Sequence, residues 1–154
     1  MSVVVTSEQK MRRRNAVLQF LTVLVAGNLV WEIGQMPLYT LWLTGTAKEV
    51  AYAILHCTIG DVLIACVSLA VALKLFGGPD WPRTRFRVVA IAMISIALSY
   101  TLFSEWWNTE IRQAWAYRDI MPKLPILGTG LSPVLQWLTV PALGFLRVSY
   151  LYRR

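Results

Sequence analysis

Residues 50–75 read VAYAILHCTIGDVLIACVSLAVALKL, an apolar run that contains a single acidic residue, Asp61, and a single lysine. A membrane-spanning helix needs about 20 mainly apolar residues to cross about 30 Å of hydrocarbon. This run is long enough, so it predicts a spanning helix. An acid inside such a helix costs about 2.5–3.5 kcal/mol to insert, and it is a functional candidate for that reason.

Three further apolar stretches precede or follow this run in the sequence, at residues 16–43, 87–108 and 128–150. The whole chain of 154 residues is 56% hydrophobic and only 15% charged, with a mean hydropathy of +0.53. A soluble domain of this size has a more polar composition. The sequence therefore predicts an all-α fold in which residues 1–154 form a single membrane domain, a polytopic four-transmembrane-helix bundle.

Residues 109–127, between the third and fourth predicted spans, have a mixed character. They carry Trp115 and Tyr117 together with Pro122 and Pro125. The segment is too aromatic for a solvated loop and too interrupted for a further span. We expect it to form an amphipathic cap on the outer surface of the membrane.

The distribution of basic residues predicts the orientation. Most of the fifteen Lys and Arg residues lie in the amino-terminal tail, between the second and third spans, or at the carboxy terminus. Because loops rich in Lys and Arg stay in the cytoplasm, both termini are predicted to be cytoplasmic in an integral multi-pass protein of a bacterial inner membrane. Trp81, beside Pro82 in the second connection, is expected to be an interfacial anchor. The basic residues of these segments are Lys10, Arg12, Arg13, Arg14, Lys74, Arg83, Arg85, Arg87, Arg147, Arg153 and Arg154.

Some classes of partner are disfavoured by the residues present. The net charge of +7 follows from the basic segments, which attract anionic membrane lipid, and no nucleic-acid-binding motif accompanies it. Cys57 and Cys66 fall on opposite faces of one predicted helix, and His56 is the only histidine. The sequence therefore predicts membrane lipid as a partner, and it predicts no nucleic acid, metal site or cofactor.

Two more acids, Glu32 and Glu105, lie within the first and third predicted spans. Counting about 1.5 Å of rise per residue from the basic anchors places both near the outer rim of the membrane and Asp61 near the midplane. Glu32 and Glu105 are expected to be exposed to water, paired with an arginine of residues 109–127, or part of a site. Asp61 is expected to be protonated, paired with His56 or bound to a ligand. The candidates for acid–base catalysis are Asp61, Glu32, His56 and Glu105.

Polar and aromatic side chains gather in the same outer half of the spans. Below Asp61 no second ionisable residue continues a path to the cytoplasm, so the pattern predicts an outward-open pocket rather than a channel. Each polar side chain has an alternative role as a hydrogen-bonding group between helices. The candidates for ligand binding are Trp31, Gln35, Tyr39, Tyr100, Ser104, Asn108, Trp115 and Gln136.

One short pattern resembles a known family. It is a run of Glu, Gln, Pro and aromatic residues within residues 31–39, followed by the intramembrane His56. This pattern resembles the EXPERA superfamily, which includes sterol isomerases and sigma-2-receptor-like proteins, over the first span and the start of the second. The resemblance implies a four- or five-helix membrane bundle with an acid-lined, sterol-binding cavity, in which Glu32 is the acid and His56 part of the wall. It also implies that Gln35 and Pro37 shape the cavity. The matching residues of the run are Trp31, Glu32, Gln35, Pro37, Leu38 and Tyr39.

Three functions remain open at this point. The first, which we favour, is a pocket that binds a small apolar ligand (isoprenoid- or sterol-like) or a cationic one, with or without isomerising it by acid–base chemistry. The second is an accessory or assembly subunit of a larger membrane complex, in which the acids pair with a membrane protein partner. The third is a proton-coupled small-molecule transporter, which four helices would form as a homo-oligomer. Whether the protein is an enzyme is not decided by these residues.

Overall fold

The computed structural model describes residues 6–125 and 128–152, and this part of the chain is helical without a β-strand. Four of its helices are long and apolar enough to cross a membrane, which confirms the predicted all-α bundle of four spanning helices. A 3₁₀ turn, a short helix and a π-helical turn complete the secondary structure. The elements are α1 (Ser7–Gln35), the 3₁₀ turn Met36–Leu38, α2 (Leu41–Thr44), α3 (Ala47–Phe76), α4 (Phe86–Trp106), the π turn Trp107–Ile111 and α5 (Leu131–Tyr152).

The first helix differs most from the expected boundaries, because it begins at Ser7 and ends at Gln35 rather than covering residues 16–43. Its start is fixed by a capping box, in which the Thr6 side chain accepts from the backbone N–H of Gln9 and the Gln9 side chain accepts from that of Thr6. Met36 follows directly after its end and starts the 3₁₀ turn, in which Pro37 is the second residue. The basic residues near the amino terminus are therefore part of the helix itself.

The segment expected to be an amphipathic cap is not helical beyond Ile111. Residues 112–125 instead follow the connection between α1 and α2. Tyr39 and Tyr117 form an isolated antiparallel bridge, and the backbone N–H of Thr40 donates to the carbonyl of Ala116 over 3.0 Å. The prolines lack the backbone N–H that a helix needs at their positions. The hydrogen bonds to another segment take the place of the bonds that a helix would form. Residues 126–127, at the end of the expected cap, lie outside the described residues.

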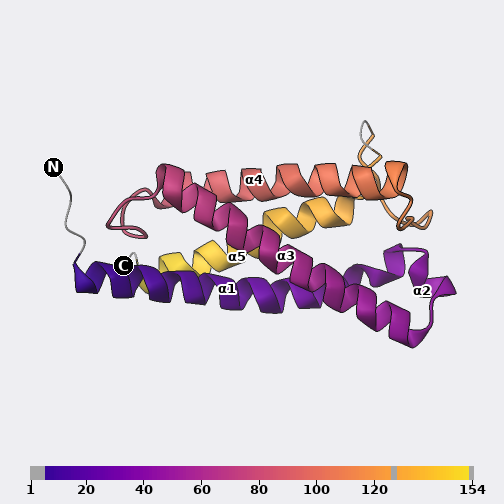
Figure 1. Ribbon diagram of the computed structural model, residues 1–154, viewed down its shortest axis with the longest axis horizontal. Coiled ribbons are helices and arrows are strands. Elements are labelled where there is room, and N and C mark those ends of the chain that lie inside the picture. Colours follow the sequence, from indigo (N-terminus) through magenta and orange to yellow (C-terminus); the bar gives the residue numbers. More distant parts are fainter. Residues whose placement is uncertain (1–5, 126–127, 153–154) are drawn as a thin grey trace.

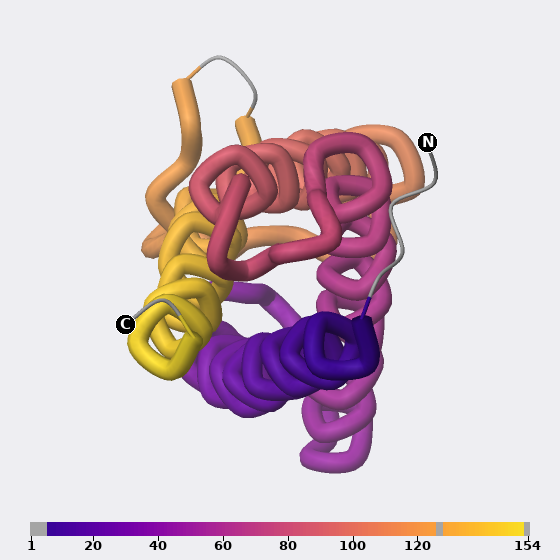
Figure 2. The backbone as a smooth tube through the Cα atoms, turned by 90° about the vertical axis from the view of Figure 1, so that its left-hand side faces the viewer, coloured from indigo at the N-terminus to yellow at the C-terminus, as the bar shows by residue number. Residues whose placement is uncertain are grey.

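The four long helices occupy the corners of the bundle in Figure 2. Helix α1 packs against α3 and α5, and α4 packs against the same two helices, so α1 and α4 are diagonally opposite. Helices α1 and α5 approach closely at two glycines. A Cβ atom added to Gly27 would lie 2.7 Å from Cγ1 of Val140, and one added to Gly144 would lie 2.8 Å from Cδ2 of Phe20.

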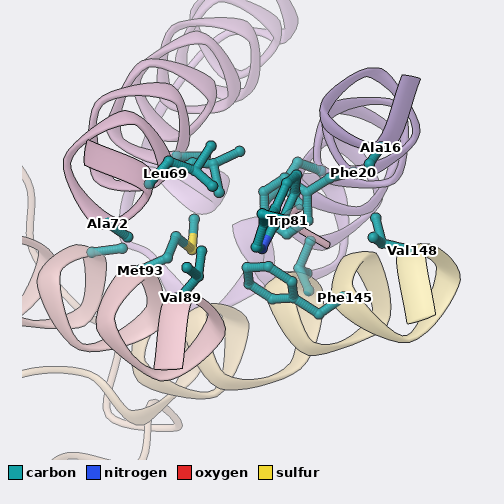
Figure 3. Close-up of a cluster of buried hydrophobic side chains, with 14 of the residues drawn as sticks. Ala16, Phe20, Leu69, Ala72, Trp81, Val89, Met93, Phe145 and Val148 are labelled. Atoms are coloured by element: carbon teal, nitrogen blue, oxygen red, sulfur yellow. The ribbon is translucent and has the colours of Figure 1, made fainter. Parts of the chain in front are cut away.

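Helix α1 begins and α5 ends at one end of the bundle, here called the terminus end; the opposite end is called the cavity end (Figure 1). The connection between α3 and α4 lies at the terminus end and carries Trp81 into the core, where it is 0% exposed. The expectation that Trp81 is an interfacial anchor was therefore wrong. Figure 3 shows Trp81 among Phe20, Met93 and Phe145, from three different helices. Aromatic burial of this kind closes the terminus end.

Helix α3 is oblique to the other helices. At the terminus end it lies beside α4, where small residues such as Ala65, Ala72 and Ala97 are fully buried. Toward the cavity end it swings away from α4 and toward the side of α1, in both views of the backbone (Figures 1 and 2). The first turns of α3 thus lie to the side of the bundle, and the four helices no longer meet in one core there.

Candidate functional site

A cavity of about 1060 Å³ lies where α3 diverges from α4. Its walls come from the end of α1, the first half of α3, the end of α4, the start of α5 and the residues that follow the π turn. Every acid–base candidate and every ligand-binding candidate from the sequence lines this cavity, with the exception of Trp31. The structure therefore collects side chains from four spans into a single space, larger than the roughly 300–1,000 Å³ of most small-molecule sites.

Two acids from different helices, Glu32 of α1 and Asp61 of α3, meet at a single amide from α5. The Nε2 atom of Gln136 donates to Oε1 of Glu32 over 3.1 Å and to Oδ2 of Asp61 over 2.7 Å. Because both carboxyl groups contact this one nitrogen atom, they lie close to each other. Two carboxylates at that separation repel, and one shared proton removes the repulsion and forms a hydrogen bond. We call these two residues the acid pair.

The acid pair corrects two expectations about depth and pairing. Asp61 was expected near the midplane and Glu32 near the outer rim, but the two residues contact the same nitrogen atom. The two acids therefore lie at the same level of the bundle. Within residues 6–125 and 128–152, no hydrogen bond or ion pair joins Asp61 to His56.

The acid pair is held by a chain of neutral hydrogen bonds. Nε2 of Gln35 donates to Oε1 of Glu32 over 2.7 Å, and Oε1 of Gln35 accepts from the hydroxyl of Ser132 over 2.8 Å. The indole N–H of Trp31 donates to the same hydroxyl over 3.1 Å. Trp31 packs against the buried core, so its contact is with the residues behind the cavity wall and not with a ligand. Satisfied networks of this kind fix side-chain positions.

Glu105 of α4 lies in the same cavity and is held by Tyr117, whose hydroxyl donates to Oε2 of the carboxylate. The backbone bridge between Tyr117 and Tyr39 places this hydroxyl, and the two rings lie 5.4 Å apart. Burial, followed by the nearby carboxylate of Glu105, raises the pKa of Tyr117, so the phenol stays neutral and donates. Sequence analysis did not include Tyr117 among the candidates.

The arginines of the third connection do not pair with the cavity acids. Nη1 of Arg118 donates to the carbonyl of Pro37 over 2.6 Å, and Arg112 lines the cavity without an ion pair to Glu32 or Glu105 in the described residues. Glu32 is only 5% exposed, so the expectation of a water-exposed rim residue was wrong for it. The ion pairs found in the described residues join Arg12 to Glu8 and to Asp80, at the terminus end.

Several candidates form the open side of the cavity, between α3 and α4. His56 is exposed and stacks on the ring of Tyr52, with 5.7 Å between ring centroids. Tyr52 is 68% exposed and Tyr100, across the opening on α4, is 53% exposed. These residues lie within helices that are long and apolar enough to cross a membrane.

Two buried polar residues escaped the sequence analysis although a spacing rule would have found them. Asn28 is 1% exposed, and its Oδ1 accepts from Gln136 while its Nδ2 has no partner in the described residues. Thr101 is 7% exposed and lines the cavity. Each lies four residues before an acid, Asn28 before Glu32 and Thr101 before Glu105, and residues at that spacing share a helix face. Two further candidates, Ser104 of α4 and Asn108 of the π turn, are joined to each other by a side-chain hydrogen bond.

Neither a protein-family model, nor a curated protein, nor a solved structure matches this chain.

Proposed function

We propose that the cavity binds an amphiphilic ligand whose basic group is held by the acid pair and whose apolar body lies between α3 and α4. The observation that carries the proposal is the convergence of Glu32, Asp61 and Glu105 in one cavity, without a paired cation in the described residues. Carboxyl groups in a low-dielectric environment need a proton or a cation. A ligand with a protonated amine would supply that cation in place of the shared proton.

The rest of the lining fits such a ligand. Tyr39, Tyr100, Trp115 and Trp137 present aromatic rings, which attract an ammonium group as well as apolar surface. Ala53, Leu63 and Ile64 add apolar surface on α3. The open side toward the lipid admits a ligand that is dissolved in the membrane. The polar end of such a molecule would face the acid pair and its apolar end the opening.

The shared proton of the acid pair would also allow acid–base chemistry. A carboxylic acid beside a carboxylate is able to donate a proton to one carbon of an isoprenoid- or sterol-like skeleton and to accept one from another. The resemblance of residues 31–39 to the EXPERA superfamily favours this extension. His56 stacks on Tyr52 at the open side, so we assign the proton transfer to the acid pair alone.

An assembly subunit is the second candidate, because a partner helix with a basic residue would satisfy the same acids through the same opening. A transporter is disfavoured by the terminus end, where Phe20, Trp81 and Phe145 are packed across the bundle. The placement in a bacterial inner membrane with both termini in the cytoplasm is also a proposal, and the distribution of Lys and Arg supports it. A fluorescent protein fused to the carboxy terminus should fold and fluoresce if that end is cytoplasmic.

Binding of dodecylamine tests the proposal. The protein in lipid nanodiscs should bind this amine saturably and bind dodecanol, its uncharged analogue, more weakly. Asp61→Asn should weaken amine binding by about ten- to one-hundredfold, because it removes a charge-assisted hydrogen bond. Asp119→Asn, at an exposed aspartate outside the cavity, is the matched control. Equal binding by wild type and Asp61→Asn would refute the role of the acid pair.

Native mass spectrometry of the protein extracted gently from its own membrane separates the ligand from the subunit hypothesis. A bound small molecule that is lost in Asp61→Asn would support the cavity. A stoichiometric protein partner that is lost in the same variant would favour the assembly subunit.

A further inference from the structure

Thr101 has a hydroxyl group for which the protein provides no hydrogen-bond partner in the described residues. The residue is 7% exposed and lines the cavity. A buried hydroxyl without a partner is destabilising, and most buried polar groups are paired. The position of this hydroxyl therefore needs an explanation.

Other hydroxyl groups in this part of the chain form a hydrogen bond that the hydroxyl of Thr101 does not form. The side chains of Thr58, Ser99 and Thr109 each donate to the backbone carbonyl four residues earlier, over 2.8 Å. This is the usual way for a helical Ser or Thr to satisfy its hydroxyl inside a membrane. The hydroxyl of Thr101 makes no such bond. It is thus an unpaired hydroxyl at the wall of the cavity.

Thr101 is on α4, which is diagonal to α1 and its Glu32 and packs against α3, the helix that carries Asp61. Glu105, one turn further along α4, lines the same wall, and its carboxylate already accepts from Tyr117. The unpaired hydroxyl of Thr101 therefore lies one helical turn from a carboxylate that is already bonded.

We propose that Thr101 forms a second polar subsite and that the ligand is an amino alcohol amphiphile, with its amine on the acid pair and a hydroxyl on Thr101. This inference rests on the proposed function and names the ligand class more narrowly. A hydroxyl group both donates and accepts, so it complements the threonine hydroxyl in either direction. An amphiphile with only an amine would leave Thr101 unpaired and would bind less tightly.

The test compares dodecylamine with a series of hydroxydodecylamines in which the hydroxyl is moved stepwise along the chain. One position of the hydroxyl should improve binding to the wild-type protein in nanodiscs by about two- to tenfold over dodecylamine. Thr101→Val should abolish this gain, whereas Thr101→Ser should keep it. Ser99→Ala, on the same helix but outside the cavity lining, is the matched control.

The possible results are distinguishable. If no hydroxyl position improves binding, or if the gain survives Thr101→Val, the second subsite is refuted while the acid pair stands. If dodecylamine itself does not bind the wild-type protein, the proposed function and this inference fall together. A second measurement needs no ligand: Thr101→Val should melt at the same temperature as wild type or higher, and a clear decrease would mean that the hydroxyl has a partner within the protein.

Discussion

The two ends of the bundle are built from the same four helices and have opposite interiors. At the terminus end Ala16, Phe20, Trp81, Met93 and Val148 are fully buried and fill the space between the helices. At the cavity end the helices enclose about 1060 Å³ lined by four acids, amides and aromatic rings. The difference originates in the oblique course of α3, which is close to α4 at one end only. The packed end provides the stability that permits an open, polar site at the other.

The largest expected effect is the loss of stability when Trp81 is replaced. Trp81→Ala should lower the free energy of unfolding by about 3–5 kcal/mol, because it leaves a large void in the packed end. Thermal unfolding in detergent measures the change. Trp42→Ala removes the same side chain from an exposed position at the cavity end and is the control. Similar losses in the two variants would mean that the ends do not differ in packing.

Gly144 tests the close approach of α1 and α5. Gly144→Ala should destabilise the protein by about 1–3 kcal/mol, because the new Cβ would meet Phe20 and Leu24 within 3 Å. Gly34→Ala is the control, since nothing lies within 4 Å of its Cβ position. If Gly144→Ala unfolds at the wild-type temperature, the two helices are further apart than described.

Tyr117 tests how the cavity end is held together. Tyr117→Phe removes the hydrogen bond to Glu105 and should cost about 1.5 kcal/mol or more, as bonds to charged groups do. We also expect faster cleavage by protease between residues 112 and 125. Tyr39→Phe keeps the neighbouring ring and leaves the bond to Glu105 in place, so it should behave like wild type. Equal protease resistance of the two variants would contradict the role of the Tyr117 hydroxyl.

The smallest effect is expected for the stability of Asp61→Asn. The substitution removes a charge that has no paired cation, so the ligand-free protein should be as stable as wild type or more stable by about 1 kcal/mol. Thermal unfolding without added amine measures this. A large loss of stability would mean that Asp61 is structural, and the comparison between a supporting end and a functional end would then be wrong.

The sequence was sufficient for the helices and for most of the cavity lining. Apolar runs of spanning length predict the four helices, and polar side chains are rare enough in such runs that each one is noticeable. Trp81 could not be placed, because its burial depends on a loop that folds back into the bundle. The meeting of Glu32 and Asp61 depends on the tilt of α3, which is set by packing against neighbours and not by residue counts. Thr101 was missed because threonine is common in helices of this kind.

The acid pair also has a consequence for biosynthesis. Gln136, the amide that joins Glu32 to Asp61, is on α5, which the ribosome makes after the other three spanning helices. Until α5 is inserted, both acids reside in a growing chain that lacks their shared donor. Helix α5 also packs along α1, which is made first among these four helices, so the two spans must find each other across the chain that lies between them. The span made last among the four therefore closes the bundle and completes its site.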